Sequence, residues 1–258
     1  MYLGKLLVTL LAAPVIAPVP STLAQQVVAQ APAQQAPAPA QAAPKAEAPK
    51  AVEAPKAAEK KVDPEVLGLV ARMQAFYEKT QDFTSEFKQD YKYKALRRTQ
   101  TSTGKVSYKK PGLMRWEYEK PSSRTFVLAG EKVYAYDPGA QTLSVGRIDT
   151  TQLSASVTFL FGQGKLADEF SISKGTCKDC KGMLLVLDPL KAEPRFRQVR
   201  LEVDPKTAQV LKSTVVDPDG SENTIAFLNL KTNVGVAADS FKLNPPEGTR
   251  IDDFTKRK

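Results

Sequence analysis

Apolar residues recur at helical spacing in the first patterned segment of the chain. These residues are Val66, Leu69, Val70, Met73, Phe76 and Tyr77. Because they fall mostly three or four positions apart, they form one apolar stripe on a helix. Asp63-Pro64-Glu65 precedes the stripe and is typical of a helix start, since Asp caps free amides and Pro fits the first turn. We predict an amphipathic helix that ends near Lys79.

From Phe83 onward the apolar period changes to two residues, which indicates strands with one apolar and one polar face. The clearest case is the stretch in which Met114, Trp116 and Tyr118 alternate with charged residues. Turn sequences such as Asp137-Pro138-Gly139 separate successive segments of this kind. Strands joined by such short turns are expected to pair antiparallel with their neighbours in the sequence.

The alternation is interrupted once. Apolar residues return to helical spacing at four positions before Gly162-Gln163-Gly164, and these are Leu153, Val157, Leu160 and Phe161. Strand patterns then resume over residues 183–187, 196–203, 210–216 and 224–230. We therefore predict a mainly β (α+β) domain with a single antiparallel sheet of about ten strands. The sheet is expected to curl into an unclosed half-barrel, covered by the N-terminal helix and the short inserted helix.

The first 62 residues differ from this domain. Lys5 precedes the apolar run LLVTLLAAPVIA, which is too short to span a bilayer. Thr22-Leu23-Ala24 offers the small residues that a signal peptidase recognises, so we predict a secretory signal peptide over 1–24. An uncleaved anchor is the alternative. Residues 25–62 consist mainly of Ala, Pro, Gln, Lys and Glu and are expected to form a disordered linker. The folded domain is then 63–258.

Composition limits the possible partners and chemistry. The chain has 37 basic and 28 acidic residues, of which residues 1–62 hold six lysines and three glutamates. The domain therefore keeps 31 basic and 25 acidic residues, a mild excess with no basic stripe beyond the tail Lys256-Arg257-Lys258. We expect no nucleic-acid partner. The chain contains no His, which excludes Ser-His and Cys-His catalysis and His-ligated metals.

The only two cysteines form the motif Cys177-Lys178-Asp179-Cys180. It lies in a predicted loop between strands, and in an oxidising compartment a disulfide between Cys177 and Cys180 is the favoured interpretation. A thioredoxin-type active site needs a strand-to-helix junction, whereas the following MLLVL resembles a strand. A zinc site would need two further Cys or His ligands. We predict no catalytic site, no metal and no cofactor.

An apolar excess remains on one face of the predicted sheet. Aromatic and Met side chains are ordinary core residues, but they can also form the adaptable wall of a ligand cavity. The predicted helices look too small to fill a curled sheet of this size. Lys110 alternates in register with Val106 and Tyr108, which aims a cation at the same side, where it needs a partner. The candidate wall residues are Met73, Phe83, Phe87, Tyr91, Val106, Tyr108, Met114, Trp116 and Tyr118.

At these residues the chain resembles the periplasmic outer-membrane lipoprotein carrier proteins, the LolA family. The resemblance extends over roughly Val66 to Lys258. It is strongest in FTSEFKQ (83–89), GKVSYKKPGLMRWEYEKP (104–121), GEKVYAYDP (130–138) and FKLNPPEGTRIDD (241–253). It implies an unclosed β-barrel under a helical lid, here Leu153 to Phe161, with an inner cavity that takes up the acyl chains of a lipoprotein.

The resemblance also implies partners and a latch. Such carriers accept acylated lipoproteins from an inner-membrane ATP-driven lipoprotein-releasing complex and pass them to an outer-membrane lipoprotein acceptor. The family's typical latch for the lid is an Arg before the Pro, where this chain has Lys110, and Met114 stands where an aromatic residue is usual. We expect a monomeric periplasmic carrier that is not an enzyme. A periplasmic sensor of lipid or lipoprotein, a carrier of another acylated lipid, and a thiol enzyme are the alternatives.

Overall fold

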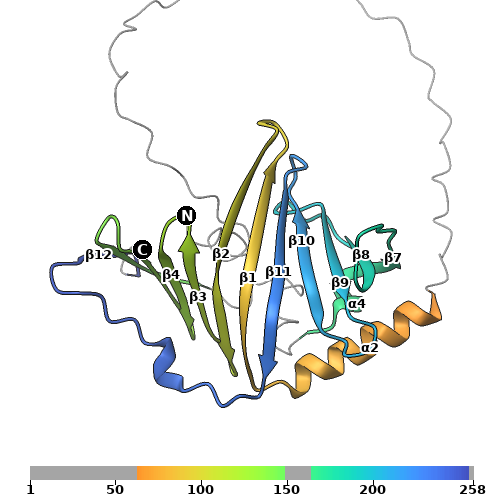
Figure 1. The fold of residues 1–258 in the computed structure, drawn as a ribbon, viewed down its shortest axis with the longest axis horizontal. Helices are drawn as coiled ribbons and strands as arrows, with labels where there is room; N and C mark the ends of the chain where they lie inside the picture. Colours follow the sequence, from red (N-terminus) through yellow and green to blue (C-terminus); the bar gives the residue numbers. More distant parts are fainter. Residues whose placement is uncertain (1–62, 149–163, 256–258) are drawn as a thin grey trace, which may run out of the picture. The chain divides into compact units, whose positions relative to one another are not determined.

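The computed structural model of the protein describes residues 63–148 and 164–255 (Figure 1). The chain enters the domain through helix α2 (Pro64–Lys79). Asp63 caps this helix, because its Oδ1 accepts a hydrogen bond from the Glu65 amide at 2.9 Å. The predicted N-terminal helix is therefore confirmed, and its apolar stripe is buried. No helix within the described ranges is long and apolar enough to cross a bilayer.

After α2 the described chain forms twelve strands and two short helical segments. The strands are β1 (Asp82–Tyr93), β2 (Arg98–Lys109), β3 (Leu113–Lys120), β4 (Arg124–Ala129), β5 (Lys132–Asp137), β6 (Thr142–Arg147), β7 (Phe170–Lys174), β8 (Met183–Pro189), β9 (Gln198–Val203), β10 (Val210–Val216), β11 (Glu222–Thr232) and β12 (Arg250–Asp253). The helical segments are α4 (Leu166–Glu169) and the 3-10 helix η3 (Ala238–Phe241). The predicted inserted helix, Leu153 to Phe161, lies outside the described residues.

All twelve strands belong to one sheet with the order β12-β6-β5-β4-β3-β2-β1-β11-β10-β9-β8-β7. The two ends of this order are not paired with each other, which confirms the predicted unclosed, mainly β architecture. The expectation of a wholly antiparallel sheet is wrong at one edge, where β12 pairs parallel with β6. The chain reaches that edge through the connection 233–249, and a parallel pair requires such a long return.

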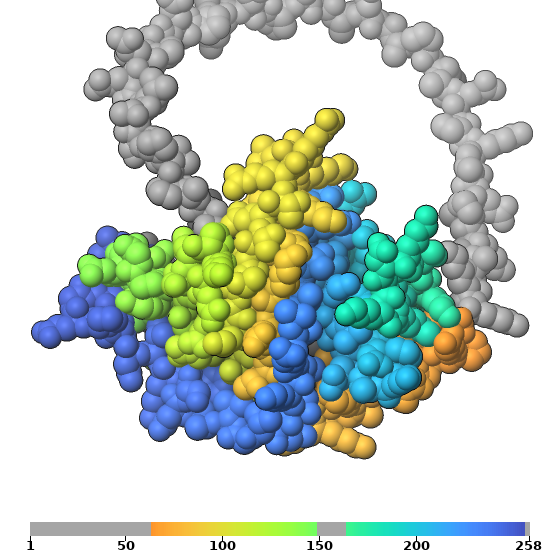
Figure 2. Space-filling model, in the orientation of Figure 1, coloured from red at the N-terminus to blue at the C-terminus, as the bar shows by residue number. Residues whose placement is uncertain are grey.

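Strands β1 and β2 form the longest hairpin of the sheet and project beyond their neighbours (Figures 1 and 2). Each has 12 residues, and the partner strand β3 pairs with β2 only from Thr103 to Lys109. On its other side β1 pairs with β11 as far as Lys92. This central hairpin joins the two halves of the sheet.

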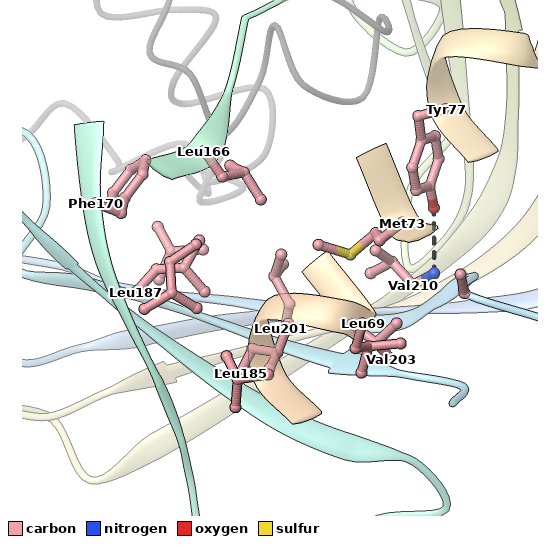
Figure 3. Close-up of a cluster of buried hydrophobic side chains, with 14 of the residues drawn as sticks. Leu69, Met73, Tyr77, Leu166, Phe170, Leu185, Leu187, Leu201, Val203 and Val210 are labelled. Atoms are coloured by element: carbon pink, nitrogen blue, oxygen red, sulfur yellow. Dashed lines mark hydrogen bonds between the residues drawn. The ribbon is translucent and has the colours of Figure 1, made fainter. Parts of the chain in front are cut away.

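The buried side chains form two clusters along the sheet. The first, the helix cluster, lies where α2 covers the strands from β7 to β10 (Figure 3). It consists of Val66, Leu69, Met73, Tyr77, Leu166, Phe170, Ile172, Leu185, Leu187, Phe196, Val199, Leu201, Val203, Ala208 and Val210. The second, the aromatic cluster, consists of Phe83, Phe87, Val106, Tyr108, Trp116, Tyr118, Leu128, Val133, Ile148 and Ile225.

Candidate functional site

Polar contacts fasten helix α2 to the sheet. The buried hydroxyl of Tyr77 accepts a hydrogen bond from the Val210 amide at 3.2 Å (Figure 3). Burial raises the pKa of Tyr77 to about 12, so the phenol is neutral at physiological pH. Near the other end of the helix, Lys174 Nζ lies 2.6 Å from Glu65 Oε2. The helix is therefore held at both ends over its half of the sheet.

Lys110 lies at the carboxyl end of the same helix. Its Nζ donates hydrogen bonds to the carbonyl oxygens of Tyr77 at 3.3 Å and Glu78 at 2.5 Å. The last carbonyls of a helix have no partner within the helix and carry partial negative charge, so a cation is favourable there. The backbone amide of Lys110 also donates to the Gln81 carbonyl at 2.8 Å. The Lys110 side chain thus links the turn after β2 to the end of α2. Its predicted partner, the lid Leu153 to Phe161, lies outside the described residues.

The structure brings most of the predicted wall residues together in the aromatic cluster. The members that the sequence had singled out are Phe83, Phe87, Val106, Tyr108, Trp116 and Tyr118. They lie on one face of three adjacent strands, because Phe83 stands opposite Tyr108, and Val106 stands opposite Trp116. All six are buried. This apolar surface has no member from a helix of the described chain.

Phe87 is the centre of the ring contacts in this cluster. Its ring centroid lies 4.9 Å from that of Trp116 and 5.0 Å from that of Tyr118, both in edge-on arrangements. Gly104 on β2 stands between Phe87 and Tyr118 in the register. A Cβ at Gly104 would lie 2.9 Å from the Phe87 ring and 2.0 Å from the carbonyl oxygen of Glu117. The missing side chain therefore lets the rings from β1 and β3 meet across β2.

The other three predicted wall residues lie elsewhere or at the margin. Met114 packs against the aromatic cluster, and Trp116 Nε1 donates to its sulfur at 2.9 Å. Tyr91 is not in the cluster, since its hydroxyl donates to Asp217 and its ring packs on Tyr93. Met73 belongs to the helix cluster.

Several cluster members were not among the predicted wall residues. These are Leu128, Val133, Ile148 and Ile225. The alternation of β4 and β5 placed Leu128 and Val133 on strands, but only the pairing register assigns them to this face. Ile225 comes from β11, which pairs with β1 across more than a hundred residues of chain. No local pattern in the sequence predicts that Ile225 belongs to this cluster.

A small apolar cavity lies between the end of α2 and the aromatic cluster. It is lined by Tyr77, Phe83, Met114, Trp116, Phe227 and Leu230. Its volume is about 10 Å³, which is room for about one water molecule. An acyl chain therefore requires a wider opening than the described conformation provides.

A larger hollow of about 320 Å³ lies at the β7–β8 edge of the sheet. Its lining mixes two stacked rings with charged groups, and consists of Asp168, Glu169, Phe170, Pro189, Lys191, Ala192, Glu193 and Phe196. Charged groups in contact with hydrocarbon lose hydration without compensation. This hollow is therefore unsuited to an acyl chain.

Cys177 and Cys180 form a disulfide in the loop between β7 and β8, with Cα atoms 5.5 Å apart. The loop is also held by Glu202 Oε1, which accepts hydrogen bonds from the amides of Lys181 at 2.6 Å and Gly182 at 3.2 Å. Burial opposes ionisation of Glu202, but these bonds and Lys212 outweigh it and keep its pKa below the usual range. Over residues 63–148 and 164–255, no group of three or more acidic or Cys residues is placed to hold a metal ion.

Comparison with known proteins adds an independent line of information. The model of the family described as outer membrane lipoprotein carrier protein LolA matches residues 78–244. The outer-membrane lipoprotein carrier protein of Pseudomonas paraeruginosa is 27% identical over 184 residues, which cover 70% of this chain and 86% of that protein. The protein of the same description from Dechloromonas aromatica is 27% identical over 185 residues, with 71% and 87% covered.

A solved structure of an uncharacterized conserved protein from Thermus thermophilus covers 72% of this chain and 98% of its own, with 11% identity and a TM-score of 0.48. The lipoprotein LppX of Mycobacterium tuberculosis covers 69% and 100%, with 12% identity and a TM-score of 0.43. Likenesses this distant carry no functional information. The family model, in contrast, spans more than half of the chain, and the chain belongs to the LolA family of outer membrane lipoprotein carrier proteins.

Proposed function

We propose that the protein is a periplasmic carrier that binds the acyl chains of lipoproteins at its aromatic cluster and shuttles them from the inner to the outer membrane. Family membership supports a lipoprotein-binding carrier. The observation that carries the proposal is the aromatic cluster itself, a continuous apolar surface over β1 to β5 and β11 with no member from a described helix. The other half of the same sheet is packed by α2.

The energetics favour a wall of this composition. Leaving one acyl chain of about fifteen methylenes in water costs on the order of 10 kcal/mol, at ~0.8 kcal/mol per methylene. A carrier must replace that water with protein surface and still release its cargo. Aromatic rings and the flexible Met114 side chain supply a large apolar area that adapts to the guest.

Uptake requires the site to widen, because the cavity beside the aromatic cluster has room for about one water molecule. From the sequence, we assign the role of lid to the segment with Leu153, Val157, Leu160 and Phe161. Lys110 would stabilise the closed state through its bonds to the last carbonyls of α2. Opening would break these bonds and expose the aromatic cluster to the cargo.

The proposed cycle defines partners and location. The carrier would receive lipoproteins from an ATP-driven releasing complex of the inner membrane and deliver them to an acceptor at the outer membrane. A signal peptide over 1–24 would export the chain, and residues 25–62 would act as a spacer. The protein would act as a monomer, without a cofactor and without enzymatic chemistry.

Native mass spectrometry of the protein purified from periplasm tests the proposal. We expect additional mass that matches a diacylated or triacylated polypeptide. Free lipid in place of a polypeptide would favour the second candidate, a sensor or a carrier of another acylated lipid. A protein that carries no acylated molecule and releases no lipoprotein from spheroplasts would contradict both.

The role of Lys110 has its own test. Lys110→Leu removes the donor to the α2 carbonyls, so we expect a variant that loads lipoprotein and fails to release it. Lys110→Arg should retain transfer, because it keeps the positive charge and donors. Lys109→Leu removes a neighbouring positive charge that has no role in this proposal, and it should transfer normally. Normal transfer by Lys110→Leu would exclude the latch.

A further inference from the structure

Two buried polar residues interrupt the apolar face that carries the aromatic cluster. Gln89 on β1 and Asn223 on β11 are 2% and 1% exposed. Gln89 Nε2 donates to Asn223 Oδ1 at 2.9 Å. Asn223 stands opposite Tyr91 in the register, and Gln89 follows Phe87 at the next position on that face of β1. The pair therefore lies beside the aromatic cluster, on the same side of the sheet.

Two donors on this face have no acceptor among the described residues. They are Asn223 Nδ2 and the hydroxyl of Tyr118, whose side chain is buried among the cluster's rings. Burial raises the pKa of Tyr118 well above its usual value, so the phenol keeps its proton. Buried donors without an acceptor are rare in proteins, because each loses its hydrogen bonds to water without compensation. An acceptor from outside the described chain would remove this cost.

The chemistry of the missing partner follows from its surroundings. Both groups donate, so the partner must offer acceptor atoms. At Tyr118 the partner must also lie against Phe87, because the Tyr118 ring packs on Phe87. Asn223 lies further along the same face, opposite Tyr91 and bonded to Gln89. Hydrocarbon alone cannot accept a hydrogen bond. An acyl ester combines an apolar chain with a carbonyl that accepts bonds and donates none.

We propose that Tyr118 and Asn223 bind the ester carbonyls of the acyl chains, so that the site recognises acyl esters and not merely hydrocarbon. This inference rests on the proposed function, because it assumes that acyl chains occupy the aromatic cluster. It assigns the donors a specific role. The chains fill the apolar surface, and the two donors fix how far the ester end enters. Resident waters, one at each donor, are the competing explanation.

Paired lipids that differ only in the ester test the inference. Dipalmitoyl phosphatidylglycerol and its di-O-hexadecyl ether analogue share head group and chain length, but the ether has no carbonyl. We expect the wild-type protein to prefer the ester lipid about tenfold in a native mass spectrometry competition, as one or two net hydrogen bonds allow. Equal affinity for the two lipids would overturn the inference and leave the carrier function intact. Binding of neither lipid would also overturn the inference, while the mass bound to the protein purified from periplasm decides separately on the carrier function.

Three variants locate the effect. Tyr118→Phe keeps the ring and removes the hydroxyl, so the preference should fall about threefold. The double variant Gln89→Leu/Asn223→Leu removes both partners of the buried pair and should lower the preference by a similar factor. Tyr134→Phe makes the same chemical change on the opposite face of the sheet, since Tyr134 alternates with the cluster residue Val133, and should keep the full preference. A preference that survives both site variants would exclude these donors.

Discussion

The helix cluster and the aromatic cluster lie on the same sheet, and both arise from alternating apolar residues along its strands. They differ in what packs against those residues. In the helix cluster, aliphatic side chains from α2 interlock with those of the strands from β7 to β10. In the aromatic cluster, rings from β1, β2 and β3 make up five of the ten members, and a small cavity lies at its border. The first half is completed by the chain's own helix. We propose that the second half takes a guest.

The buried tyrosines of the two clusters differ in the same way. Tyr77 in the helix cluster has a hydroxyl that accepts a bond from Val210, whereas the Tyr118 hydroxyl in the aromatic cluster has no partner among the described residues. Both side chains are buried. Among the described residues, the helix cluster therefore satisfies its buried tyrosine hydroxyl, while the aromatic cluster does not.

Truncation of a buried side chain on α2 should have the largest effect on the free energy of unfolding. Leu69 is fully buried in the helix cluster, so Leu69→Ala should lower the free energy of unfolding by about 3 kcal/mol. Leu67 on the same helix is 54% exposed, and Leu67→Ala should change it by less than about 0.5 kcal/mol. Urea denaturation measures both. Equal effects of the two substitutions would show that α2 is not packed as described.

Alkaline pH should weaken the helix cluster through Tyr77. Its pKa is about 12 in the folded protein and 10.0 in the reference state, so between these values the unfolded chain binds fewer protons. Stability from this group is therefore complete below pH 10 and is lost as pH rises, by about 2–3 kcal/mol in all. Unfolding measured at pH 9 and pH 11.5 should show a smaller loss in Tyr77→Phe than in the wild type. An identical loss of stability in the two proteins would show that a group other than Tyr77 causes it.

Removal of the disulfide should affect stability and not lipid binding. The Cys177–Cys180 bridge closes a four-residue loop, for which chain entropy predicts about 2 kcal/mol of stabilisation. The double variant Cys177→Ser/Cys180→Ser should melt at a lower temperature and carry the same bound mass. Loss of function in a variant that remains folded would instead support thiol chemistry.

The smallest predicted changes in stability come from replacing each of the two buried tyrosines by Phe. Tyr77→Phe leaves the Val210 amide without its acceptor and should cost about 1 kcal/mol at neutral pH. Tyr118→Phe removes a buried hydroxyl that has no partner, so stability should stay equal or rise by about 1 kcal/mol. Chemical denaturation of both variants gives the two values. A clear loss of stability in Tyr118→Phe would mean that its hydroxyl is already satisfied.

The sequence predicted helix α2 and most of the strands because their signals are local. The stripe of α2 and the alternation of Met114, Trp116 and Tyr118 each lie within one segment. The parallel pairing of β12 with β6 could not be predicted, since the connection 233–249 has no pattern that selects an edge.

The membership of the candidate site was only partly predictable for the same reason. Tyr91 continues the alternation of Phe83 and Phe87, but it lies where β1 extends past β3, and it bonds to Asp217 instead. The neighbours Gln89 and Asn223 meet only because β1 pairs with β11, which no local pattern reveals. Long-range register, and not residue type, decided which side chains form the site.

Trp116 offers the most direct test of the central claim that acyl chains occupy the aromatic cluster. It is the chain's only tryptophan, it is 4% exposed and it packs against Phe87. We would titrate the protein with a diacylglyceryl peptide whose chains carry bromine, a short-range quencher, and with the same peptide without bromine. The account predicts that only the brominated cargo quenches Trp116, in step with binding measured by native mass spectrometry. Full binding of the brominated cargo with unchanged Trp116 emission would contradict it.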